Sequence, residues 1–241
     1  ALARIGAHTY QMEATQDLAL TGLDLGENPS VISAMVKFNN TERLRKVIND
    51  AMDIHGGRAV VGGPRNYLAA MYNAVPIGIT VEGANILTRC LMIFGQGATR
   101  CHPYVYREME AAACADAQEG LQRFDALLAQ HICFALGNVG KGLLSGLSLG
   151  KFESSPVSGP TACYYRQLTR MSRALALCTD VSMLLLGGEL KRREMLSARL
   201  GDVLSHLYMA SATLKYYEDE GRQSADLPYL HYALRRSLWL M

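Results

Sequence analysis

The fold class is decided by residues 30–57, which read SVISAMVKFNNTERLRKVINDAMDIHGG. Apolar side chains recur here every three or four residues, the spacing of one helix face, at Ile32, Met35, Phe38, Leu44, Val47, Ile48 and Met52. The Asn28 side chain can cap a helix, Pro29 fits its first turn, and the pair Gly56-Gly57 suits its end. This stretch therefore predicts one long amphipathic helix that stops at His55.

The same spacing recurs on both sides of this stretch, while strict apolar–polar alternation is nearly absent. Further helices are expected over about residues 2–21, from about residue 81 past Phe94, and over residues 104–136, 164–215 and 227–240. Glycine and proline mark the connections: residues 58–79 hold at most one short helix, and residues 140–146 and 154–160 are expected to be flexible. The fold class predicted is all-α, with a helical bundle followed by a second helical extension.

Composition excludes several classes of protein. The chain has 241 residues, 49% of them hydrophobic, which is too apolar for a disordered protein. The formal net charge of +2 gives no reason to expect nucleic acid as a partner. Six cysteines without a CxxC pair predict reduced, mostly buried thiols and a cytoplasmic location. No apolar run reaches the roughly 18 residues of a membrane span, and without an HxxxH pair no metal site is expected.

One short segment carries a candidate for acid–base chemistry, VEGANILTR at residues 81–89. Glu82 is a lone carboxylate among apolar neighbours, and a carboxylate in a water-poor site is a useful base near neutral pH. Gly83 has no side chain, so a substrate could approach the backbone beside that carboxylate. Taken alone, an isolated Glu-Gly more often marks only the start of a helix.

The two glycine-containing segments together resemble the C-terminal helical domain of the acyl-CoA dehydrogenases. That family has a Q-h-h-G-G-x-G segment followed by an E-G-T-x-x-I-x-R segment, which IHGG at residues 54–57 and EGANILTR at residues 82–89 match. The resemblance covers residues 1–107, which would form that domain without its first helix. Residues 108–241 are similar to the helical extension of the larger bacterial long-chain enzymes, with LKRRE at residues 190–194 and LGD at residues 200–202 as the most telling pieces.

The resemblance implies a set of site residues. Glu82 would be the catalytic base, Gly83 and Arg89 would join it in the substrate site, and FAD would contact Asp53, Gly56, Gly57 and Ala84. Two of these positions depart from the family pattern. Asp53 stands where Gln reaches the FAD of a neighbouring subunit, and Ala84 replaces the usual Thr.

The reaction implied is oxidation of long-chain fatty acyl-CoA to trans-2-enoyl-CoA in β-oxidation, with loss of an α-proton to Glu82 and of a β-hydride to flavin N5. The expected partners are the acyl-CoA substrate, an electron-transfer flavoprotein as acceptor and further copies of the chain. We also expect the chain to be a piece of a longer polypeptide that supplies the other domains, and to be inactive alone.

Two other interpretations stay open. The chain can be a non-catalytic helical assembly module that keeps the family fold, which Asp53 and Ala84 favour and Glu82-Gly83 opposes. Residues 108–241 can also dock on a partner or on the inner face of the membrane, through Leu184-Leu185-Leu186 and the terminal Leu238-Trp239-Leu240-Met241. Ordinary core packing is the preferred explanation of those apolar residues.

Overall fold

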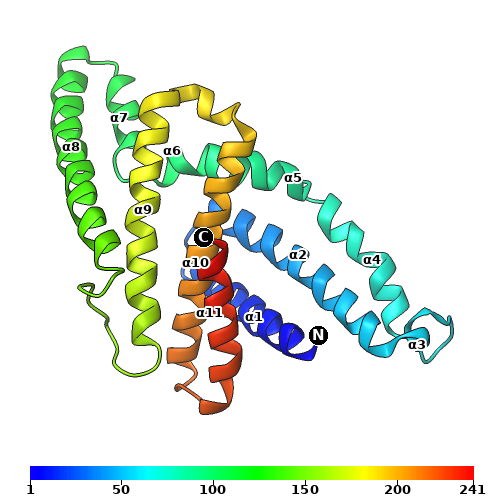
Figure 1. Cartoon of the computed structure of the whole chain (residues 1–241). Coiled ribbons are helices and arrows are strands. Elements are labelled where there is room, and N and C mark those ends of the chain that lie inside the picture. Colours follow the sequence, from blue (N-terminus) through cyan, green and yellow to red (C-terminus); the bar gives the residue numbers. More distant parts are fainter. The chain divides into compact units, whose positions relative to one another are not determined.

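The computed structural model describes residues 1–241, and every regular element in it is a helix (Figure 1). The all-α prediction is therefore confirmed. The chain forms two compact units, one of residues 1–89 with 202–241 and one of residues 90–201. The expected division after residue 107 differs from these units, because the C-terminal helix packs on the N-terminal one and joins the first unit.

The first unit is built around its second helix. Its elements are α1 (Leu2–Asp24), α2 (Ser30–His55), α3 (Gly57–Val60), α4 (Leu68–Thr80), α5 (Asn85–Leu87), α10 (Glu194–Asp219) from Asp202 onward, η3 (Ser224–Asp226) and α11 (Leu227–Leu240). Helix α2 packs against α1 on one side and α4 on the other, as Figure 1 shows. It ends at His55, as predicted, where Gly56 takes a φ of +55°. The predicted side-chain cap by Asn28 does not form, and Pro29 precedes the helix instead.

Helices α1 and α11 approach closely because α1 presents small residues to its neighbour. A Cβ on Gly6 would lie 2.5 Å from the Tyr229 ring. Buried Gln11 adds a polar link, since its amide donates to Thr213 Oγ1 at 3.4 Å and to Ser237 Oγ at 3.3 Å. Gln11 thereby connects α1, α10 and α11 inside the unit, which satisfies three buried polar groups at once.

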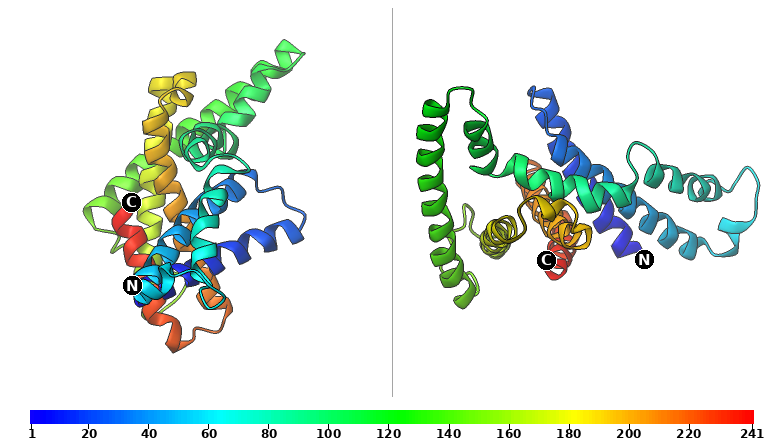
Figure 2. Two further views of the ribbon diagram at one scale, coloured as in Figure 1. Left: turned by 90° about the vertical axis from the view of Figure 1, so that its right-hand side faces the viewer. Right: turned by 90° about the horizontal axis from the view of Figure 1, so that it is seen from above.

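The second unit contains the end of η1 (Thr88–Gln96), a π-helix, and then α6 (Gly97–Cys101), α7 (Val105–Ala112), α8 (Ala117–Leu147), α9 (Ala162–Leu186), η2 (Gly187–Lys191) and the first residues of α10. Helix α8 packs against both α7 and α9, which can be followed in Figure 2. The contact of α7 with α8 is tight, because a Cβ on Gly120 would lie 2.7 Å from the carbonyl oxygen of Ala111.

Several predicted helix boundaries are wrong in this unit. The expected helix over residues 104–136 is two helices, because the carboxylate of Asp116 accepts from the N–H groups of Gln118 and Glu119 and starts α8. The segment 140–146, expected to be flexible, lies inside α8, where residues with high helix propensity separate its glycines. The helix expected over residues 164–215 is interrupted at Gly187, whose φ is +49°. Residues 154–160 do form a non-helical connection.

The expected helix from residue 81 also starts later. Glu82 and Gly83 both have positive φ angles, which no helix accommodates, so α5 begins at Asn85.

Much apolar surface is exposed. Leu184, Leu185 and Trp239 are 85%, 75% and 79% exposed, so core packing does not explain them.

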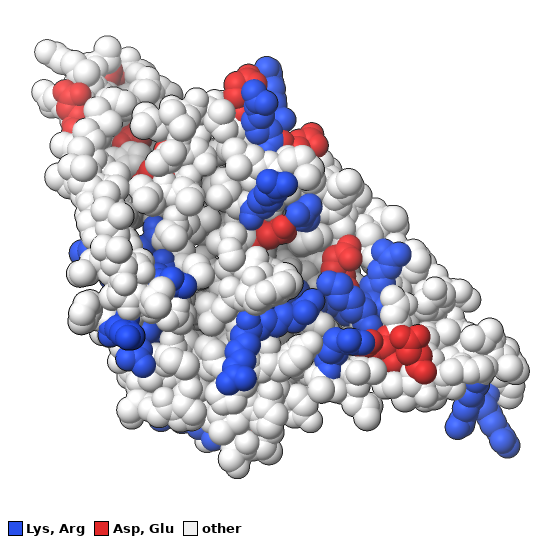
Figure 3. All heavy atoms as spheres, viewed as in Figure 1, with Lys and Arg blue, Asp and Glu red and all other residues white.

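The six cysteines are free, as predicted, but only Cys90 is buried. The face in Figure 3 shows few charges over α8 and a gathering of Lys and Arg over α2 and α11.

One helical segment, Ala162–Lys191, is long and apolar enough to cross a membrane by length and composition alone. The bent pair Leu68–Thr80 and Asn85–Cys101 meets the same criteria when taken together. This differs from the expectation that no segment qualifies. Helix α9 also carries Asp180 and Arg173, which pair with His102 and Glu153 inside the second unit.

Two glycines of α8 give opposite predictions. Gly140→Ala should raise the free energy of unfolding by about 0.5–1 kcal/mol, because its Cβ meets open space and alanine favours a helix. Gly120→Ala should lower it by about 1–3 kcal/mol, because its Cβ meets a backbone carbonyl. Urea unfolding followed by circular dichroism measures both, and destabilisation by Gly140→Ala would contradict the helical assignment of this segment.

Candidate functional site

The candidate base lies in a tight turn between α4 and α5. Glu82 has a φ of +56° and Gly83 a φ of +89°. A positive φ in a residue with a side chain is strained, and such strain clusters at functional positions. The Glu82 side chain is exposed, so the residues of this chain do not supply the water-poor surroundings that a neutral-pH base needs. Its neighbours Ile77, Val81, Ile86 and Leu87 are exposed as well, which leaves an apolar surface around the carboxylate.

Helix α2 holds this turn from one side. The Lys37 ammonium donates to the Gly83 carbonyl and to Asn85 Oδ1, both at 2.8 Å. The Asn85 amide donates in turn to Thr41 Oγ1 at 2.9 Å and to Glu42 Oε1 at 3.0 Å. Sequence reasoning missed Lys37. It directly precedes Phe38, a residue of the apolar stripe that was expected to be buried. The backbone beside Glu82 is thus fixed by hydrogen bonds, while its carboxylate stays free to face a ligand.

Arg89 closes the motif with an ion pair instead of an open cation. Its guanidinium donates from Nε and Nη2 to the two carboxylate oxygens of Asp202, at 2.9 and 2.6 Å. A bidentate pair fixes direction as well as distance. Arg89 is therefore a positioning residue in this structure, tying the segment after Glu82 to α10. Ala84 directly precedes α5 and offers no side-chain donor.

The glycine pair lies far from Glu82. The Tyr67 hydroxyl contacts His55 Nε2 at 3.1 Å, which places the end of α2 at the start of α4, whereas Lys37 reaches Gly83 beyond the end of α4. The 13 residues of α4 separate the two places by about 20 Å. Asp53, Gly56 and Gly57 are exposed together, and a Cβ on either glycine would meet nothing within 4 Å. The structure thus gathers the site residues into two groups and does not unite them.

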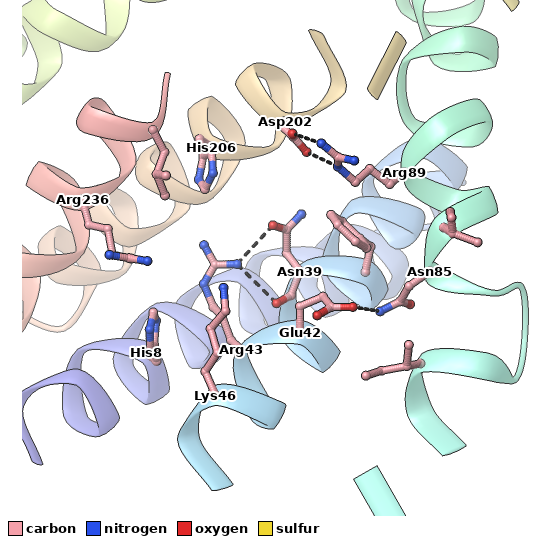
Figure 4. Close-up of a pocket in the computed structure, with 14 residues that line it drawn as sticks. His8, Asn39, Glu42, Arg43, Lys46, Asn85, Arg89, Asp202, His206 and Arg236 are labelled. Atoms are coloured by element: carbon pink, nitrogen blue, oxygen red, sulfur yellow. Dashed lines mark hydrogen bonds and ion pairs between the residues drawn. The ribbon is translucent and has the colours of Figure 1, made fainter. Parts of the chain in front are cut away.

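A cavity of about 500 Å³ lies beside the Glu82 turn, within the first unit (Figure 4). It is lined by His8, Phe38, Asn39, Glu42, Arg43, Lys46, Ile79, Asn85, Ile86, Arg89, Asp202, His206, Arg236 and Leu240. Burial is the main cause that lowers the pKa of His8 and of His206 to about 4, and the Arg43 guanidinium adds to it. Sequence reasoning missed this cavity. The only local signal was that Asn39 and Arg43 continue the buried i, i+4 row of Met35.

The second unit contains a cluster of side chains of metal-ligating type, although the sequence predicts no metal site. Ligand atoms of His102, His131 and Asp180 lie within 4.8 Å of one another. The spacing test missed them because they come from three different elements. His102 Nε2 lies 2.8 Å from Asp180 Oδ1, and His131 Nδ1 lies 2.9 Å from Glu108 Oε1.

The hydrogen bonds of His102 oppose metal binding. Its Nδ1 accepts from the N–H groups of Tyr104 and Val105, both at 3.2 Å, so the ring proton belongs on Nε2, which donates to Asp180. A protonated nitrogen has no lone pair for a metal. Burial lowers the pKa of His102, against the raising effect of Asp180. The cluster acts as a half-buried hydrogen-bonded link among α7, α8 and α9.

Comparison with known families agrees with these motifs. Residues 1–93 match the acyl-CoA dehydrogenase C-terminal domain, and residues 99–241 match the bacterial type of acyl-CoA dehydrogenase C-terminal region. The chain belongs to the acyl-CoA dehydrogenase family. In this acyl-CoA dehydrogenase chain, the Glu82 turn lies in the general domain and Asp202 in the bacterial-type region. The cavity of Figure 4 takes residues from both, so it is built where the bacterial-type region covers the general domain.

The tether on the Glu82 turn gives a first prediction for this site. Lys37→Met should speed amide hydrogen exchange of residues 82–85 by about tenfold, because the Gly83 carbonyl and the Asn85 amide lose a charged partner. Exchange followed by mass spectrometry measures this. Arg45→Met, an exposed change on the same helix, should leave that segment unaffected. Equal exchange rates in both variants would show that Lys37 does not hold the turn.

The two histidines of the cavity, His8 and His206, predict how stability depends on pH. Because their pKa values are about 4 when folded and 6.5 when unfolded, the unfolded state binds more protons between these values. Stability should be complete above about pH 6.5 and fall toward pH 4, by at most about 2 kcal/mol for each histidine at pH 5. Urea unfolding of the wild type and of His206→Gln measures this, and the variant should show a smaller decrease. The same pH slope in both proteins would exclude His206 as a cause.

Proposed function

We propose that this acyl-CoA dehydrogenase chain contributes the catalytic base of an FAD-dependent enzyme that oxidises long-chain fatty acyl-CoA in β-oxidation. The observation that carries the proposal is the Glu82 turn: a carboxylate on strained backbone, fixed by Lys37 and surrounded by exposed apolar side chains. A substrate and further protein that cover this surface would exclude water from the carboxylate. Exclusion of water is what a base needs to remove a weakly acidic proton.

Glu82 would take the α-proton of the thioester as the carbonyl becomes polarised. The carboxylate is aimed by its backbone, and the tethers at Gly83 and Asn85 keep that backbone from moving when the proton is transferred. Gly83 leaves space for the thioester beside the base. FAD, when bound, supplies the acceptor for the hydride that leaves the β-carbon.

The residues expected to contact FAD fit one edge of that cofactor. Gly56 and Gly57 have open space around them and expose their backbone. Asp53 can only accept hydrogen bonds, so it suits hydroxyl or amino donors and not a phosphate. Because these residues lie about 20 Å from the Glu82 turn, they would hold the FAD of a neighbouring subunit, in agreement with the family resemblance.

The proposal includes assembly into a homo-oligomer. Exposed apolar residues recur along α8 at Leu121, Leu128, Ile132, Leu136, Leu143 and Leu147, which form a row at helical spacing. Monomeric proteins rarely expose rows of this length, and symmetric pairing of such helices is common. Docking on the inner membrane face through Leu184 and Leu185, and reoxidation by an electron-transfer flavoprotein, remain parts of the proposal.

The test is anaerobic titration of the full-length protein with palmitoyl-CoA, followed through the flavin absorption band. Glu82→Gln should fold normally, but its rate of flavin bleaching should decrease by about 10²- to 10⁴-fold, because the amide cannot accept the proton. The matched control is Glu110→Gln, which changes an exposed carboxylate on α7 and should bleach like the wild type.

The outcomes separate the alternatives. Bleaching of the wild type and the control alone supports Glu82 as the base. Bleaching of all three would keep the family and assign the base to another residue. A full-length protein that binds no FAD would favour a non-catalytic helical assembly module.

A further inference from the structure

The cavity in Figure 4 has an excess of positive charge. Four cations line it, Arg43, Lys46, Arg89 and Arg236, against two carboxylates, Glu42 and Asp202. Arg89 and Asp202 neutralise each other in their bidentate pair. Glu42 accepts a hydrogen bond from Asn85 and forms no ion pair. Arg43, Lys46 and Arg236 are then opposed only by Glu42, so a net charge of +2 remains uncompensated in the cavity.

Arg43 is the strongest indication of an anion site in this cavity. It is only 7% exposed, and its Nη1 donates to the carbonyl and side-chain oxygens of Asn39, which are neutral acceptors. Its Nε has no partner. Proteins bury a guanidinium when a carboxylate or another anion pairs with it. Here no carboxylate of the chain does so.

The other basic groups converge on the same place. In Figure 4 the Arg236 guanidinium, from α11, points toward that of Arg43. Burial, and after it Arg236, lowers the pKa of Arg43 to about 10, and the pKa of Lys46 is also lowered, by burial and then by Arg43 and Arg236. His206, from α10, has a buried Nδ1 without a partner. Repulsion among these groups would be relieved by a multiply charged anion between them.

The rest of the lining is apolar. Phe38, Ile79, Ile86 and Leu240 contribute to the wall, and the volume of about 500 Å³ lies in the range of small-molecule sites. An inorganic ion alone would leave this part of the cavity without contacts. A molecule with an anionic head and an apolar body would use both parts.

We propose that this cavity binds a small phosphorylated molecule, with its phosphate between Arg43, Lys46 and Arg236 and its apolar body against Phe38 and Leu240. Two uncompensated positive charges match a phosphate dianion better than a single carboxylate, and arginine forks suit its oxygens. The binding residues of this site take no part in the proposed dehydrogenase reaction. Asn85, which anchors the Glu82 turn, lies in its wall and would sense whether it is filled.

The experiment is isothermal titration calorimetry of the full-length protein in phosphate-free buffer. The probes are phenyl phosphate, inorganic phosphate and phenol. Phenyl phosphate should bind most tightly, inorganic phosphate more weakly and phenol not at all. Equal affinity for the two phosphates would overturn the role of the apolar wall, and absence of binding by both would overturn the site.

Variants locate the binding. Arg236→Gln and Lys46→Gln should each weaken phenyl phosphate about ten- to a hundredfold, and Arg235→Gln, an exposed neighbour on α11 outside the cavity, should not. Arg43 is left unchanged in the test, because replacement of a buried side chain would also change the stability of the fold. A loss of affinity in Arg235→Gln as large as in Arg236→Gln would assign binding to surface charge. Glu82→Gln should bind phenyl phosphate like the wild type, so failure of this site and failure of the proposed base are distinguishable.

Discussion

The ion pair of Arg89 with Asp202 holds the segment that follows the Glu82 turn against α10, while α2 holds the turn itself. It joins residues 113 positions apart, one in the general domain of the family and one in the bacterial-type region. Both side chains are about one third exposed, so the pair itself contributes only about 1 kcal/mol. Its importance is geometric. Two parallel hydrogen bonds fix the helix that follows the Glu82 turn against α10, and α10 and α11 complete the wall of the cavity beside it.

The interior of this unit is unusually polar where its helices meet. Gln11 finds partners on two other helices, so its burial costs little. Arg43 is different, because its charge is buried against neutral oxygens and faces a second arginine. Apolar side chains at the same positions would pack more stably. A fold that keeps such a group therefore implies a contact outside the packing of these helices, and an anion in the cavity provides one.

The sequence predicted what depends on neighbouring residues. The end of α2 at His55 followed from Gly56, whereas the turn at Glu82 and Gly83 did not, because the sequence predicted a helix from about residue 81. Sequence-based prediction was wrong where residues distant in the chain determine the structure. Gly140 lies within a helix because it belongs to the 31 residues of α8, and His102 contacts Asp180 only after three helices assemble. The cavity was missed for the same reason, since His8 and Arg236 come from opposite ends of the chain.

The separation of the two groups of site residues constrains how any enzyme of this design can work. Helix α4 packs along α2, so no local movement brings Gly57 to Glu82 across about 20 Å. In the proposed oligomer, the glycine pair of one chain would act on a cofactor whose reacting end lies at the Glu82 turn of another. Assembly would then be a requirement for a complete site, and the long apolar row on α8 gives the chain a surface for it.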